Sequence, residues 1–128
     1  MKKSILLGGL AAAVTLLPVA AFADLTSQIA IAKTHAGLAA KATTIDAVHM
    51  HLHHALNCLV GPQGADFDKT NENPCAKAGN GIQADGASAA MVAPAIAATK
   101  TGLADNDLAG AQKDAMAAAA AIAKIPAK

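Results

Sequence analysis

The sequence predicts an all-α protein, a four-helix bundle built of two helical hairpins that a long loop joins. Three observations support this prediction. Alanine dominates the chain, and no segment alternates polar and apolar residues as a strand would. Larger apolar residues recur at spacings of three and four in several separate stretches. A weak repeat also aligns residues 42–45 with residues 105–108, an offset of 63.

The first 23 residues have the features of an export signal. A short lysine-containing start is followed by an apolar core from Ile5 to Val19, and small residues suited to signal peptidase end at Ala23. The apolar run is too short and too interrupted to favour a membrane span. We therefore expect cleavage after Ala23, a single helical domain over residues 24–128, no membrane span after cleavage, and a periplasmic or secreted location.

The charge balance argues against binding to nucleic acid. The chain has ten lysines, no arginine and nine acidic residues, and removal of two lysines with the signal leaves a formal charge of −1 with histidine neutral. Arginine is the usual reader of phosphates and bases. No basic patch remains, and we expect no nucleic-acid partner.

The first helix is expected from Asp24 to about Lys41, with Thr26 or Ser27 as its N-cap. No glycine or proline follows before the next apolar stripe, so one long N-terminal helix and a three-helix fold form the alternative. The internal repeat favours a turn at residues 42–44, because the matching segment at 105–107 is a typical signal for a helix end and a helix start.

The second helix is expected from Thr44 to Val60, where Gly61-Pro62 ends it. Its core stripe consists of Ile45, Val48, Leu52, Leu56 and Leu59. Residues 61 to 86 lack periodicity and predict a long loop. The third helix should run from about Ala87 to Lys100, with Pro94 at a kink or in its first turns. The fourth should run from Asp107 to about Lys124.

The two cysteines, Cys58 and Cys75, predict a disulfide that ties the long loop to the second helix. In an exported protein disulfides persist. Closing a loop of this size stabilises a fold by about 3 kcal/mol on the chain-entropy model. Neither Cys-x-x-Cys nor Cys-x-x-Cys-His occurs, which excludes a dithiol redox motif and covalent haem attachment.

Four of the five histidines lie between residues 49 and 54, and His35 lies one helix upstream. On a helix, His49 and His53 stand at i and i+4, the spacing by which two helical histidines chelate one metal ion. If the turn near residue 43 forms, His35 folds back to their level and can join them. The predicted metal ligands are therefore His49 and His53, with His35.

Met50 and His54 form a second i, i+4 pair that predicts a softer site, and His51 lies further round the helix. Imidazole with thioether suits copper, and imidazole alone suits Zn, Ni, Co or Cu. Hard cations are disfavoured because no carboxylate lies within the cluster. A calcium-loop spacing at Asp66, Asp68, Thr70 and Glu72 lacks the expected glycine and final glutamate, and turn-forming residues explain it equally well.

In layout the chain resembles the small exported, histidine-rich four-helix proteins that bind divalent metals in the bacterial periplasm. The resemblance rests on the export signal, on His35-Ala36 and on the segment from His49 to Leu56. It implies a helical bundle and metal binding. Those proteins carry histidines along all their helices, whereas none follows His54 here. The resemblance therefore implies one or two sites rather than high-capacity storage.

Together these observations predict a periplasmic transition-metal-binding protein that buffers, delivers or senses its ion. Enzymatic activity is not expected, since no G-x-S-x-G or other complete catalytic motif occurs. One alternative is an interaction module whose histidine face docks a periplasmic protein or responds to pH. Another is a protein that binds haem non-covalently between its helices.

Overall fold

Four helices and no strand form within residues 23–127, the part of the chain that the computed structural model describes. They are α1 (Leu25–Lys41), α2 (Ile45–Val60), α3 (Ala89–Ala104) and α4 (Leu108–Ile122). The predicted all-α bundle of two hairpins is confirmed. None of these helices is both long and apolar enough to pass through a membrane. The predicted export signal, apart from Ala23, lies outside the described residues.

A tight reversal separates α1 from α2, so the alternative of one long N-terminal helix is wrong. Ala42 leaves α1 in an extended conformation, and the Thr44 hydroxyl accepts a hydrogen bond from the Ala47 N–H at 3.3 Å as the N-cap of α2. The side chain of Gln112 donates to the Ala42 carbonyl at 2.7 Å. This last contact fixes the reversal against α4.

The internal repeat describes the structure closely. α1 ends and α2 begins 63 residues before the corresponding points of α3 and α4, as their bounds show. The N-caps, Thr44 and Asp107, also stand at this offset, and each accepts from the backbone N–H three residues later. The N-cap of α1 differs from its prediction: Asp24 caps this helix through its carboxylate, so Thr26 and Ser27 lie inside the first turn.

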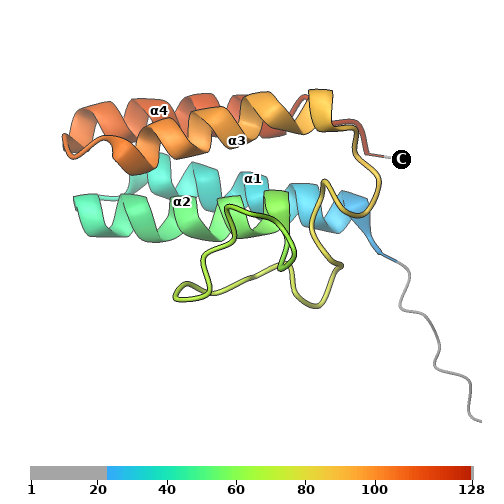
Figure 1. The fold of residues 1–128 in the computed structure, drawn as a ribbon. Coiled ribbons are helices and arrows are strands. Elements are labelled where there is room, and N and C mark those ends of the chain that lie inside the picture. Colours follow the sequence, from blue (N-terminus) through green and yellow to red (C-terminus); the bar gives the residue numbers. More distant parts are fainter. Residues whose placement is uncertain (1–22, 128) are drawn as a thin grey trace, which may run out of the picture.

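The core combines large side chains from α2 with small ones from its neighbours. The hairpins form two layers in which α1 packs on α2 and α4, and α3 packs on the same two helices (Figure 1). The fully buried residues include Val48, Leu52 and Leu59 of α2, Ala32, Ala36 and Ala39 of α1, Val92 and Ala95 of α3, and Ala111, Ala115, Ala118 and Ile122 of α4. Gly102 contributes in the same way, because a Cβ there would lie 2.7 Å from Leu52 Cδ1. Small side chains thus bring the helices close together around α2.

The long connection from Gly61 to Ser88 lies against the α1–α2 layer (Figure 1). The predicted disulfide between Cys58 and Cys75 is present, with an S–S distance of 2.05 Å. Nearer its end, the buried amide of Gln28 accepts from the Gly81 N–H at 3.0 Å and donates to Asp85 at 2.9 Å. The connection is therefore attached to both helices of the first hairpin.

Asn57 of α2 organises the first part of this connection. Its side chain is fully buried, and its amide nitrogen donates to the backbone carbonyls of Asp68, Asn71 and Glu72 at 2.9, 3.3 and 3.1 Å. Its amide oxygen accepts from the Asp68 N–H at 2.9 Å. One side chain therefore satisfies several backbone groups that have no helix or sheet to satisfy them.

Replacing Asn57 by alanine should lower the free energy of unfolding by about 1–3 kcal/mol, because it leaves buried backbone groups without hydrogen bonds. Chemical denaturation of the oxidised protein measures this loss. Asn106→Ala, at an exposed position in the connection between α3 and α4, is the matched control and should change stability by less than about 0.5 kcal/mol. Equal stabilities of the two variants would contradict this account of the loop.

Candidate metal centre

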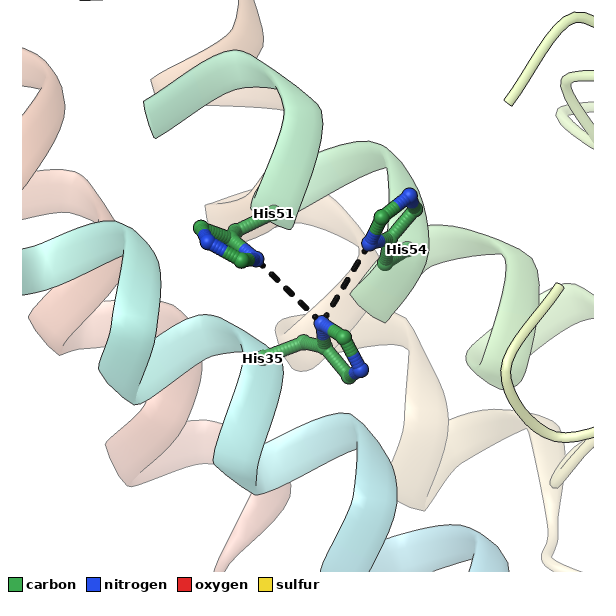
Figure 2. A group of neighbouring side chains, drawn as sticks. All are labelled: His35, His51 and His54. Atoms are coloured by element: carbon green, nitrogen blue, oxygen red, sulfur yellow. Dashed lines mark hydrogen bonds between the residues drawn. The ribbon is translucent and has the colours of Figure 1, made fainter. Parts of the chain in front are cut away.

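Three imidazoles converge on the outer side of the first hairpin (Figure 2). His35 comes from α1, and His51 and His54 come from α2. Nδ1 of His35 lies 3.3 Å from Nδ1 of His51 and 3.3 Å from Nδ1 of His54. Ligand atoms of all three residues lie within 4.8 Å of one another. We refer to these residues as the histidine triad.

The hairpin register explains this meeting. His35 and His51 lie at equal distances along the chain from Thr43, so the reversal brings them opposite one another. His54 follows His51 by three residues and therefore lies on the same face of α2, one turn further along. His54 is buried, and the other two triad residues are partly buried.

Hydrogen bonding alone does not satisfy the triad. Each neutral imidazole nitrogen carries either a proton or a lone pair. Nδ1 of His35 therefore cannot form a well-directed hydrogen bond with both of its neighbours at once. A cation would accept all three lone pairs together. The three nitrogens could therefore hold a metal ion together.

The nitrogen spacing agrees with this conclusion. Two Zn–N bonds of about 2.0–2.1 Å at the tetrahedral angle place their nitrogens about 3.3–3.4 Å apart. The two Nδ1–Nδ1 distances from His35, both 3.3 Å, have this value. The donor set of three imidazoles and the distances both fit a transition-metal ion such as Zn, Co, Ni or Cu.

The surroundings also favour the neutral, ligating form of the His35 and His54 imidazoles. Burial lowers the pKa of His35, and charge repulsion from His54 and then His51 lowers it further. Burial and the charge of His51 likewise lower the pKa of His54. Glu72 opposes both shifts. A metal competes with protons for these nitrogens, so a lowered pKa makes the site available at a lower pH.

The structure does not bring His49 and His53 together with His35. Nε2 of His49 lies 2.8 Å from the Asp105 carbonyl oxygen at the end of α3. Nδ1 of His53 lies 3.1 Å from Asp68 in the loop. The two residues thus face different neighbours on the other flank of α2. A chelating pair formed by His49 and His53 stays a prediction.

Asp68 is held in the loop by its own contacts. The Thr70 hydroxyl, the Thr70 N–H and the Asn71 side chain donate to its carboxylate, and they lower its pKa to about 2. Asp66 instead pairs with Lys100 of α3 at 2.7 Å. Asp66 and Asp68 of the calcium-loop spacing therefore have separate partners rather than one shared ion.

The remaining predicted ligands are His54 and Met50. His54 lies with His35 and His51 in the triad, and a softer site formed by Met50 and His54 stays a prediction. Met50 is 41% exposed and lies one turn before His54. The sequence contained a signal for the triad, because the i, i+3 spacing of His51 and His54 combines with the hairpin register that places His35 opposite His51.

The free energy of unfolding should fall as the pH drops below about 6.5, the ordinary histidine pKa. The folded chain lowers the pKa of His35 and His54, so the unfolded chain binds more protons in this range. Stability is retained above that pH and lost towards the lower folded pKa values. Denaturation between about pH 7 and 5 measures the slope. A His35→Gln/His54→Gln variant should show a shallower slope, and an unchanged slope would contradict the assignment.

Comparison with protein-family models, with curated proteins and with solved structures finds no match for this chain. A function for the histidine triad therefore has to be inferred from its own side chains and their surroundings.

Proposed function

We propose that this chain binds one transition-metal ion through His35, His51 and His54. The observation that carries the proposal is the position of three imidazole nitrogens around one point, with two Nδ1–Nδ1 distances of 3.3 Å. The proposed role is to buffer, deliver or sense the ion rather than to catalyse a reaction. A single triad suits these roles, since it holds one ion per chain.

The proposed location is the periplasm or the extracellular space. The Cys58–Cys75 disulfide is consistent with an oxidising compartment. A periplasmic protein that donates or receives the metal is the proposed macromolecular partner, because buffering and delivery both require transfer. A partly exposed ion would be reached directly from the surface, as His35 and His51 are only partly buried.

A bare ion suits the triad better than haem. The ring centroid of His35 lies 5.6 Å from that of His51 and 4.9 Å from that of His54. A porphyrin between two axial histidines would need these rings on opposite sides of a flat macrocycle. The three rings instead surround one small volume, which favours direct coordination of an ion.

Stoichiometric binding of Zn(II) or Co(II) to the oxidised mature chain should be lost in His54→Ala and in His35→Ala. Removing one of three nitrogen ligands should weaken binding by more than about tenfold, which is the smallest loss typical of removing a residue that only orients a ligand. Competition with a chromophoric chelator measures the affinity. Circular dichroism and denaturation of each variant establish that it is folded.

The double variant His49→Ala/His53→Ala is the matched control, because it removes two histidines from the same helix but none from the triad. It should bind one ion with wild-type affinity. Loss of binding in this variant, with retention in His54→Ala, would assign the ion to His49 and His53 and contradict the triad.

A further inference from the structure

Glu72 is the only glutamate in the sequence, and a hydrogen bond holds its backbone against α2. The Glu72 carbonyl accepts from the side chain of Asn57, which follows His54 by three residues on α2. Three residues after Glu72, Cys75 is bonded to Cys58, which follows His54 by four residues. The backbone of Glu72 is therefore fixed close to the turn of α2 that follows His54.

The carboxylate of Glu72 extends from a backbone that the Asn57 hydrogen bond holds against the turn of α2 after His54. Among residues 23–127 it pairs with no lysine or histidine, whereas Asp66 and Asp68 of the same loop each have such a partner. Its side chain is exposed and can rotate without a loss of buried packing.

We propose that Glu72 is the fourth protein ligand of the metal centre. Its carboxylate would complete a ligand set that the three imidazoles of the triad begin. This inference rests on the metal-binding function proposed above. The Glu72 carboxylate is not among the donor atoms that lie within 4.8 Å of one another. It would reach the ion by rotation of its side chain. Three imidazoles and a carboxylate suit Zn(II) or Co(II), whereas a soft donor would favour Cu(I).

Met50 is the rival fourth donor. It is 41% exposed and lies on α2 one turn before His54, on the side away from the disulfide. A thioether in the fourth position would favour Cu(I) over Zn(II). The two assignments therefore differ both in the residue whose loss weakens binding and in the ion that is preferred.

The test compares the oxidised mature chain with Glu72→Gln, Asp66→Asn and Met50→Leu in titrations with Zn(II) and Co(II). Glu72→Gln should weaken Zn(II) binding by about 10–100-fold and should change the visible absorption of bound Co(II), which reports the ligands directly. Asp66→Asn removes a carboxylate from the same loop and should bind both ions as the wild type does. Met50→Leu should also leave both measurements unchanged.

Several results would overturn the assignment of Glu72 while leaving the proposed function intact. Wild-type affinity in Glu72→Gln beside lost binding in His54→Ala would be one such result. Weakened binding in Met50→Leu would be another. A weaker affinity with an unchanged Co(II) spectrum would mean that Glu72 acts through its charge alone, and this too overturns the assignment. Failure of the wild type to bind either ion would instead refute the proposed function.

Discussion

The reversal of the chain between Lys41 and Ile45 is the constraint on which the rest of the structure depends. Ala42 and the Thr44 cap turn the backbone within three residues, and Gln112 holds the turn from α4. A continuous helix would have separated His35 from His49 by about 20 Å, at 1.5 Å per residue. The tight turn instead makes His35 face His51, and the triad follows from that register.

The composition of the core explains why the long connection between α2 and α3 is attached to the first hairpin at several points. Alanine buries little apolar area per residue, so the bundle depends on close approach of its helices around the larger side chains of α2. The disulfide and the buried amides of Gln28 and Asn57 attach the long connection to α1 and α2. These same attachments determine which loop residues lie beside the triad.

Much of this architecture could be predicted from the sequence because it depends on local signals. The bounds of α1, α2 and α4 follow from caps and periodicity, the disulfide from two cysteines, and the turn from a repeat whose caps match at Thr44 and Asp107. The third helix instead ends at Ala104, four residues beyond the predicted Lys100. The N-cap of α1 was missed because three candidate residues, Asp24, Thr26 and Ser27, stand close together, and only backbone geometry distinguishes them.

The spacing and register signal for the triad does not by itself separate its histidines from His49 and His53. Periodicity tells which residues share a face of α2, but it does not tell which neighbour covers that face. One flank of α2 meets the end of α3 and the loop. On this flank His49 contacts Asp105, and His53 contacts Asp68. The flank towards α1 holds His51 and His54. The assignment therefore depends on how the hairpins and the loop pack, which is long-range information.

The two hairpins match in register, but only the first carries histidines. The second hairpin therefore offers equivalent positions for a designed site. The offset of 63 residues relates His35, His51 and His54 to Ala98, Asp114 and Ala117 of the second hairpin, where the turn has the same length and the same cap positions. None of these three positions is fully buried. Histidines transplanted there would face one another across α3 and α4 in the same register. One fold would then carry two histidine triads, with the natural one as an internal reference for the transplanted one.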